Sequence, residues 1–171
     1  IIPRWQARAN VIRQQADALR QQAEQTAEPL VRDALQKEQS QLETQAEWMD
    51  ETLIQIVVSE GQGEVADFAK WEFDIRPHRA ILKEGFATPD GKRIDVETAF
   101  KTPEHPFRVA IVCAMWLTGF DVESLATLYI DKPMRAHTLM QAIARANRVY
   151  PGKDCGVIVD YNGMLASLRQ A

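Results

Sequence analysis

Apolar side chains recur with a helical period over the first fifty residues of the chain. One run contains no glycine and places apolar residues at intervals of three, four or seven: Trp5, Ile12, Ala16, Leu19 and Ala23. A second run continues with Leu35, Leu42, Ala46, Met49 and Leu53. Pro29 separates the two, because proline suits the first turn of a helix and not its interior. The pattern predicts an antiparallel helical hairpin over residues 1–52, as a structural spacer or docking arm.

The pattern changes after residue 52 to short β-branched runs separated by helical periods. The runs occupy residues 54–59, 109–114, 127–130 and 156–160, and the helical periods occupy residues 64–71, 76–83, 94–100 and 138–149. This alternation is typical of a parallel sheet with crossover helices. We therefore predict a three-layered α/β domain for residues 53–171, preceded by the hairpin.

Length and composition bound the class of protein. At 171 residues and 46% apolar composition, the chain is long enough for one buried core and an appendage. Its longest apolar stretches fall short of the roughly 18 residues that cross a bilayer, and its first residues lack a signal-peptide pattern. We expect a soluble, cytoplasmic protein with no membrane partner.

The cysteines and histidines do not form a recognisable metal motif. Cys113 and Cys155 both lie in apolar runs and have no neighbour at metal-ligand spacing, which favours buried, reduced thiols. The three histidines are equally scattered along the chain. We expect no metal ligands here.

Charge points to one stretch of the chain. The formal net charge of −4 argues against a protein that holds nucleic acid by a global basic field. Residues 131–154, however, contain five basic and two acidic side chains. Any contact with DNA is therefore expected to be local.

Two short motifs suggest nucleotide chemistry but fit ordinary structure better. The segment from Gly61 to Ala66 superficially matches the dinucleotide-binding fingerprint, yet the strand and acidic residue expected about 20 residues later are replaced by a helix and a loop. A plain strand-to-helix turn is favoured. Asp50 and Glu51 resemble the acidic pair of an ATPase, but they lie on a helical run, so a solvated helix end is the better interpretation.

A third group of residues has the spacing of a phosphate site. Thr118 and Gly119 follow a predicted strand, at the edge where open α/β sheets bind ligands, and glycine lets a backbone approach a phosphate closely. On a helix, Gln141, Arg145 and Arg148 share one face. Two guanidinium groups directed at one point favour a strong anion, and their planar fork matches phosphate oxygens.

Each of these residues also has a plainer interpretation. Thr138 and Gln141 fit a capping box, in which Gln141 binds only the backbone of the first helical turn. Arg145 and Arg148 fit a solvated helix face, and Gly119 fits a tight turn. The ordered combination after predicted strands favours the phosphate site.

These motifs resemble those of a known family. The segment 118–121, Thr-Gly-Phe-Asp, resembles motif V of superfamily two helicases, and the segment 141–148, Gln-x-x-x-Arg-x-x-Arg, resembles motif VI. The longer string over 107–161 is similar to the restriction (R) subunit of type I restriction-modification enzymes. Segments 57–59 and 73–79 fit the same family, and the likeness covers roughly residues 54–165.

The resemblance implies a fold and a set of phosphate contacts. Residues 53–171 would form a second RecA-like lobe, a parallel sheet with flanking helices like that of P-loop NTPases. Arg148 would be the finger-type arginine on the γ-phosphate of ATP, Arg145 its partner, and Gln141 a nucleotide-side contact. Both arginines would count as catalytic.

The resemblance also assigns the motif V loop. Thr118 and Gly119 would contact the DNA backbone, Gly119 and Asp121 would lie on the nucleotide side, and Asp121 would link the two sites. The sequence departs from the helicase pattern at two positions. Ala144 replaces a glycine common in motif VI, which suits the restriction group, and Glu123 stands where proline is expected, which leaves the path of this loop open.

The sequence contains no phosphate loop, no strand ending in an Asp-Glu pair and no nuclease centre. The chain is therefore expected to be an inactive fragment of a larger protein, with ATP and Mg²⁺ bound mainly by a first RecA-like lobe elsewhere. The family implies ATP-driven translocation of double-stranded DNA before cleavage. Its implied partners are DNA, the first lobe and nuclease domain of the same chain, and the methyltransferase and specificity subunits.

Three alternatives remain from the sequence. The chain could be the second lobe of another superfamily two helicase or remodeller, or a non-catalytic helical interaction module on a degenerate α/β domain. A nicotinamide-binding oxidoreductase, based on Gly61 and Gly63, is the most distant.

Overall fold

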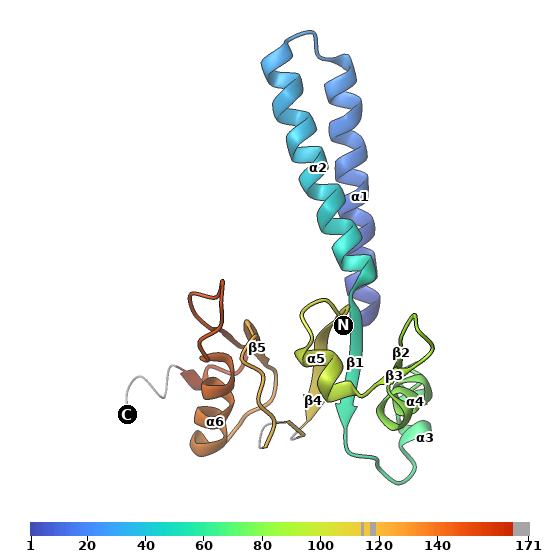
Figure 1. Ribbon diagram of the computed structural model, residues 1–171, viewed down its shortest axis with the longest axis vertical. Helices are drawn as coiled ribbons and strands as arrows, with labels where there is room; N and C mark the ends of the chain where they lie inside the picture. Colours follow the sequence, from blue (N-terminus) through green and yellow to red (C-terminus); the bar gives the residue numbers. More distant parts are fainter. Residues whose placement is uncertain (114, 117–118, 166–171) are drawn as a thin grey trace. The chain divides into compact units, whose positions relative to one another are not determined.

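The computed structural model describes residues 1–113, 115–116 and 119–165 (Figure 1). The helices are α1 (Ile2–Gln25), α2 (Pro29–Glu51), α3 (Glu64–Ala69), α4 (Arg76–Glu84), α5 (Val96–Lys101) and α6 (Ala136–Ala146). The strands are β1 (Leu53–Val58), β2 (Phe86–Ala87), β3 (Arg93–Ile94), β4 (Phe107–Cys113), β5 (Thr127–Ile130) and β6 (Val157–Asp160). The chain forms two compact units, one of Ile1–Ile54 with Pro106–Val109 and one of Gln55–His105 with Ala110–Ala171.

The first unit is built on the hairpin of α1 and α2, which run antiparallel (Figure 1). Thr26, extended at φ −86°, ends α1, and Pro29 starts α2, where its fixed φ suits the first turn. The buried core of the hairpin consists of Ala9, Ile12, Ala46 and Met49, with Trp5 and Leu42 packed against it. The small alanines let the two helices approach closely.

An aromatic pair lies where the start of α1 meets the end of α2. The rings of Trp5 and Trp48 lie 6.0 Å apart, and Trp5 Nε1 donates a hydrogen bond to Met49 O at 2.8 Å. The guanidinium of Arg108 lies 5.1 Å from the Trp48 ring and donates to Trp48 O and to Thr52 Oγ1. A cation over an indole face is attracted to it, so the tryptophans have polar and apolar partners within this unit.

The acidic pair in the sequence lies at the end of α2, as the helical pattern predicted. Asp50 forms an ion pair with Arg13 of α1, and Glu51 lies 3.4 Å from Arg108. Both carboxylates are therefore engaged by arginines on a helix end.

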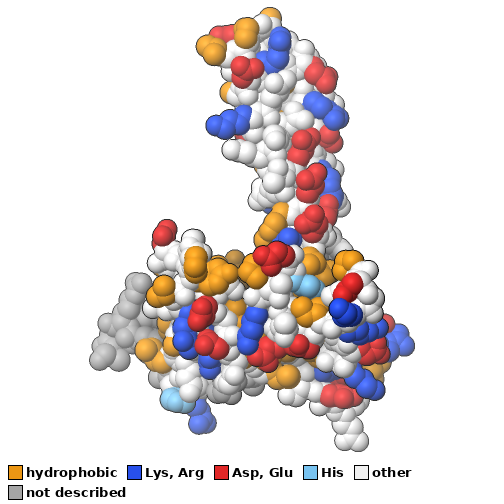
Figure 2. Space-filling model, viewed as in Figure 1, with side chains coloured by type: hydrophobic (Ala, Val, Ile, Leu, Met, Phe, Trp, Pro, Cys, Tyr) orange, Lys and Arg blue, Asp and Glu red, His pale blue; other side chains and the backbone are white. Residues whose placement is uncertain are grey.

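The two hairpin helices have the length to cross a membrane, 24 and 23 residues, but not the composition. Acidic and basic side chains lie along the visible face of the hairpin (Figure 2). Within the described part of the chain, no helix is both long and apolar enough to span a bilayer.

The second unit contains a parallel strand pair, which agrees with the α/β prediction. Strands β5 and β6 run parallel from the Thr127–Val157 pair to the Ile130–Asp160 pair. The described strands form three two-stranded sheets, β1 with β4, β2 with β3, and β5 with β6. The single RecA-like sheet implied by the resemblance is not seen among these strands.

One hairpin was missed by sequence analysis. Strands β2 and β3 pair antiparallel, with Phe86 opposite Ile94. Two-residue strands are too short to produce a recognisable alternation, and the helical period in this region was placed at 94–100. The helix α5 begins only at Val96, because the Asp95 side chain accepts a hydrogen bond from Thr98 N at 2.9 Å and acts as its N-cap.

The prediction of buried cysteines is wrong. Cys113 and Cys155 are free thiols, as predicted, but both are exposed. Cys113 is the last residue of β4, and Cys155 lies in the connection before β6. Apolar neighbours in sequence do not bury a side chain at the end of a strand.

Candidate functional site

Helix α6 carries Gln141 and Arg145 of the predicted arginine motif and packs through its apolar face. It connects β5 to β6, and Leu139, Ala142 and Ala146 are buried to 1% or less exposure. Ile130 of β5 is buried to the same degree. This packing leaves Arg145, only partly buried, free to extend its side chain from the helix.

The helix ends earlier than predicted, so Arg148 lies outside it. Asn147, at φ −95° and ψ 40°, already leaves the helical conformation. The returning chain passes so close to the helix end that a Cβ at Gly156 would lie 2.2 Å from the Ala146 carbonyl oxygen. Local helix propensity predicted a run to residue 149, but this tertiary packing ends the helix at Ala146. Arg148 therefore does not share a helix face with Gln141 and Arg145.

The two arginines nevertheless converge on one carboxylate. Arg148 Nη2 lies 3.3 Å from Asp121 Oδ1, and Arg145 Nη1 lies 3.9 Å from the same oxygen. The side chains of Arg148 and Asp121 are 47% and 48% exposed, and that of Arg145 is 25% exposed. The structure thus brings together three predicted site residues, two of them around the half-exposed carboxylate of the third, Asp121.

Gln141 makes a different contact. Its Nε2 lies 3.3 Å from His137 Nε2, one helical turn earlier. Arg135 occupies the N-cap of α6 and makes no side-chain capping bond. The capping box of Thr138 and Gln141, the plainer alternative for Gln141, is therefore not formed, and Gln141 contacts the histidine.

The loop before Asp121 contains two left-handed residues. Gly119 has φ +77°, and a Cβ atom added at this position would have no atom within 4 Å. Trp116 has φ +65°, which is unusual for a bulky residue, and its ring stacks on Phe120 with centroids 4.0 Å apart. Burial of Phe120 and Val122 on either side of Asp121 fixes its backbone. Thr118 lies outside the described residues.

Comparisons with known proteins show the family to which the chain belongs. A family model, type I restriction enzyme subunit R domain 3, matches residues 15–163. This chain belongs to the type I restriction enzyme R subunit family. The family assignment favours a restriction subunit over another superfamily two helicase or remodeller, an alternative that the motifs alone left open.

Individual relatives cover smaller parts of this R-subunit chain. The HindI type I restriction enzyme endonuclease subunit of Haemophilus influenzae is 53% identical over 79 residues, 44% of the chain and 8% of that protein. A Methanocaldococcus jannaschii protein named for the MjaIXP type I restriction enzyme endonuclease subunit is 53% identical over 98 residues, 57% of the chain and 9% of that protein. The chain thus spans less than a tenth of these relatives. No solved structure matches it.

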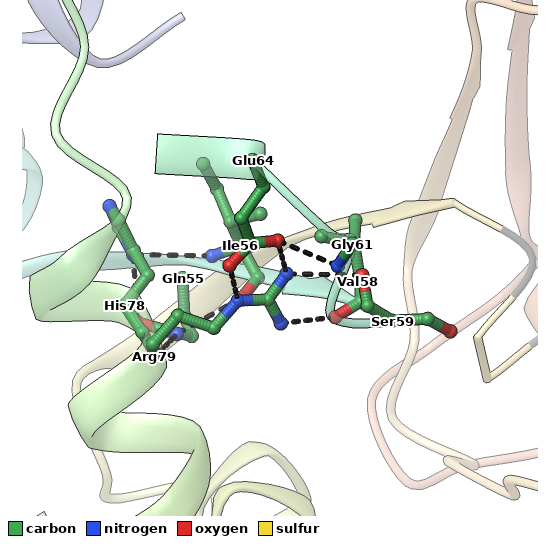
Figure 3. Close-up of polar contacts among 8 residues, drawn as sticks. All are labelled: Gln55, Ile56, Val58, Ser59, Gly61, Glu64, His78 and Arg79. Carbon is green, nitrogen blue, oxygen red and sulfur yellow. Dashed lines mark hydrogen bonds and ion pairs between the residues drawn. The ribbon is translucent and has the colours of Figure 1, made fainter. Parts of the chain in front are cut away.

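A second arginine site in this R-subunit domain follows β1 and was missed by sequence analysis (Figure 3). Arg79 of α4 and Glu64 of α3 point toward each other and form a two-pronged pair, with Nε–Oε1 at 2.6 Å and Nη2–Oε2 at 2.5 Å. Arg79 also donates to the carbonyl oxygens of Val58 and Ser59. The side chains of Arg79 and Glu64 are only 19% and 14% exposed. No sequence signal marks this pair, because it depends on the packing of two helices.

The electrostatics of this cluster keep both groups charged. The Arg79 guanidinium and the Gly61 N–H, 3.1 Å from Glu64 Oε2, lower the pKa of the Glu64 carboxyl. Hydrogen bonding to Glu64 raises the pKa of Arg79. The backbone N–H that a dinucleotide phosphate would need is therefore already engaged by a carboxylate. This supports the interpretation of the glycine segment as a strand-to-helix turn.

A buried amide adjoins the cluster. The Gln55 side chain is 1% exposed, and its Nε2 donates to His78 O at 2.8 Å and to Ile56 O at 3.0 Å. Its Oε1 must therefore accept, and it lies 2.9 Å from His78 Nδ1. A neutral histidine with its proton on Nδ1 donates to this oxygen, whereas one with its proton on Nε2 accepts at Nδ1 from the Ile56 backbone N–H, 3.4 Å away. Burial lowers the pKa of His78, which favours the neutral histidine.

The described residues contain no group of three or more His, Cys, Asp or Glu side chains able to hold a metal ion. The guanidinium groups of Arg145 and Arg148, which lie close to one carboxylate, have donors whose geometry matches the oxygens of an anion such as phosphate. Sequence analysis did not select Lys153 as a site residue. Its Nζ donates to the carbonyl oxygens of Glu123 and Arg148. In sequence it appeared only as one of the basic residues of the 131–154 stretch.

Proposed function

We propose that this chain supplies the arginine side of the ATP site in the DNA-translocating motor of a type I restriction enzyme R subunit. Arg148 contacts the γ-phosphate in the transition state, and Arg145 stabilises the same developing charge. The observation that carries the proposal is the convergence of both guanidinium groups on Asp121 Oδ1. Family membership supports the choice of protein.

The exposure of the ion pairs makes an exchange of partners physically reasonable. A half-exposed ion pair contributes about 0–1 kcal/mol, because water solvates the separated charges nearly as well. A phosphate group presents several charged oxygens to the planar guanidinium fork and can outcompete one carboxylate. Asp121 then acts as a temporary partner that keeps the two arginines together.

The nucleotide itself requires other parts of the longer protein. ATP with Mg²⁺ would be held mainly by a first RecA-like lobe, and residues 53–171 would form the second lobe, with residues 1–52 as a helical extension. Gln141, Gly119 and Asp121 would lie on the nucleotide side in the closed motor. Closure would bring the arginines to the phosphates and exclude water from them.

The remaining partners follow from the same proposal. Thr118 and Gly119 would contact the backbone of double-stranded DNA, and the left-handed Gly119 supports a close approach of the main chain. The nuclease domain of the same polypeptide would cleave the DNA. Methyltransferase and specificity subunits would complete a cytoplasmic restriction complex, while this chain alone would hydrolyse no ATP.

The test is Arg148→Ala in the full-length R subunit assembled with its partner subunits. We expect DNA-stimulated ATP hydrolysis to fall by roughly 10³- to 10⁵-fold, the usual effect of losing an arginine finger. Arg148→Lys should restore little of it, since an ammonium lacks the planar fork. The melting temperature should stay unchanged, because the side chain is half exposed.

The matched control is Arg20→Ala, which removes another exposed arginine paired with an aspartate, Asp17. It should leave hydrolysis unchanged. Hydrolysis and translocation within twofold of wild type in Arg148→Ala would remove the motor role from this arginine.

A further inference from the structure

Lys153 lies on a tight turn directly after Arg148. Its backbone N–H donates to Tyr150 O at 3.0 Å, and Gly152 takes the left-handed conformation at φ +76° that the turn requires. The turn directs the lysine side chain back along the chain. Its Nζ donates to Arg148 O at 2.9 Å and to Glu123 O at 3.0 Å.

These two carbonyl groups belong to the two segments that form the arginine site. Arg148 lies two residues beyond the end of α6, so the hydrogen bonds of the helix do not fix its backbone. Glu123 lies two residues after Asp121, the carboxylate that both arginines approach. One ammonium group therefore ties the backbone of the finger-type arginine to the loop that carries its carboxylate partner.

Packing on both sides holds the two backbone segments that Lys153 connects. Close packing of Gly156 against the Ala146 carbonyl sets where the chain returns toward β6. Burial of Val122, at 5% exposure, fixes the other segment next to Glu123. A charged hydrogen bond to a carbonyl oxygen is stronger than a neutral one, and Lys153 makes two of them. The side chain of Glu123 is not used, so a proline at this position would leave the carbonyl acceptor in place.

We propose that Lys153 is a positioning residue that sets the place of Arg148 for phosphate contact. This rests on the proposed function of the arginines. In this role Lys153 acts through the backbones of Arg148 and Glu123 rather than through the nucleotide. Because a misplacement of about 1 Å can cost 10²-fold in rate, loss of the tie should affect the chemical step more than ATP binding.

The experiment compares Lys153→Met, Lys153→Arg and Arg148→Ala in the full-length R subunit with its partner subunits. Methionine keeps the unbranched stem and removes the charge and the donors. We expect Lys153→Met to lower kcat for DNA-stimulated ATP hydrolysis by roughly 10- to 100-fold with little change in KM for ATP. Lys153→Arg should restore part of kcat, since a guanidinium can still donate to both carbonyl groups.

A structural readout accompanies the kinetics. Hydrogen exchange followed by mass spectrometry should show faster amide exchange in Lys153→Met in peptides that cover residues 119–125 and 146–150 together. The control, Lys92→Met, removes an exposed lysine paired with Asp90 and should change neither kcat nor exchange. The double variant Lys153→Met with Arg148→Ala should be no slower than Arg148→Ala alone, because the lysine acts only through the arginine.

The outcomes separate this inference from the proposed function. Wild-type hydrolysis in Arg148→Ala would overturn the function and, with it, a positioning role toward phosphate. A large loss in Arg148→Ala with wild-type kcat in Lys153→Met would overturn the positioning role alone. A lowered melting temperature with equal losses in Lys153→Met and Lys153→Arg, or additive losses in the double variant, would also overturn it, because Lys153 would then act on folding or at another place.

Discussion

The chain contains two arginine–carboxylate sites that differ in how completely they are satisfied. Arg79 and Glu64 meet through two parallel contacts, and Arg79 also binds two backbone carbonyl groups, with both side chains less than a fifth exposed. Arg148 meets Asp121 through one contact of 3.3 Å, and both side chains are about half exposed. Arg79 uses four of its five N–H donors within the fold, whereas Arg148 meets its carboxylate through a single contact.

This difference separates the enclosed arginine from the open one, to which we assign phosphate contact, better than charge or sequence position does. Both sites combine a guanidinium with a carboxylate from another segment of the second unit. Only the enclosed site would leave carbonyl oxygens and a carboxylate unsatisfied if its arginine were lost. At the open site, loss of Arg148 would leave the Asp121 carboxylate solvated by water. The two sites should therefore respond to mutation in opposite ways, with stability lost at one and activity lost at the other.

The largest stability effect is expected at the enclosed site. Arg79→Met should lower the free energy of unfolding by about 2–4 kcal/mol, because it leaves the Glu64 carboxylate and the carbonyls of Val58 and Ser59 without their donor. Urea-induced unfolding of the chain measures this loss. The free energy of unfolding of Arg79→Lys should lie between those of wild type and Arg79→Met, since lysine keeps the positive charge and lacks the planar guanidinium.

The matched control lies on the same helix. Arg76→Met removes an arginine whose ion pair with Asp74 is largely exposed, so its effect on the free energy of unfolding should be much smaller than that of Arg79→Met. Equal losses in Arg76→Met and Arg79→Met would contradict the distinction between enclosed and open arginines.

A smaller, pH-dependent effect is expected beside the enclosed site. Burial lowers the pKa of His78 in the folded chain, although Asp74 partly opposes the shift. As the pH falls below the ordinary histidine pKa of about 6.5, the unfolded chain binds the proton first. Stability is therefore complete above about pH 7 and is lost as the pH falls from that value toward the lower folded pKa.

Urea unfolding at several pH values between about 7.5 and 5 tests this sign. His78→Asn keeps a donor near Gln55 Oε1 and removes the titration, so the loss of stability on acidification should become smaller. A remaining slope is expected from His105, whose pKa burial also lowers. Identical pH slopes for wild type and His78→Asn would show that the buried histidine does not contribute.

The same contrast explains what sequence analysis could and could not predict. The glycine-free period of the hairpin and the β-branched runs follow from local pattern, and β1, β4, β5 and β6 lie within two residues of their predicted ends. The end of α6 at Ala146 depends on Gly156, ten residues later, which no local propensity encodes. The pairing of Arg79 with Glu64, fifteen residues apart, likewise requires the packing of α3 and α4.

The candidate site was predictable in residue type and not in geometry. Arg145 and Arg148 were selected by their spacing on a helix, yet Arg148 lies beyond the helix and approaches Asp121 from the irregular segment that follows it. Lys153 could not be recognised, because its two acceptors are backbone groups that carry no side-chain signature. The resemblance to helicase motifs suggested that these segments form one site. The distances between their side chains come only from the tertiary structure.

The smallest effect is expected for the Asp121–Arg148 pair itself. A double-mutant cycle with Asp121→Asn, Arg148→Met and the double variant measures the coupling between the two side chains in the free energy of unfolding. Because both are about half exposed, the coupling should lie below about 1 kcal/mol. Raising NaCl from about 50 mM to about 500 mM should reduce it further, as expected for an exposed pair that salt screens.

The corresponding cycle with Glu64→Gln and Arg79→Met provides the comparison, and its coupling should be larger and less sensitive to salt, because the enclosed pair is shielded from counterions. A coupling above about 2 kcal/mol for Asp121 and Arg148, unchanged by salt, would place the open site in the same class as the enclosed one. A phosphate would then have to displace a firmly held carboxylate, and the exchange of partners that underlies the proposed ATP contact would lose its physical basis.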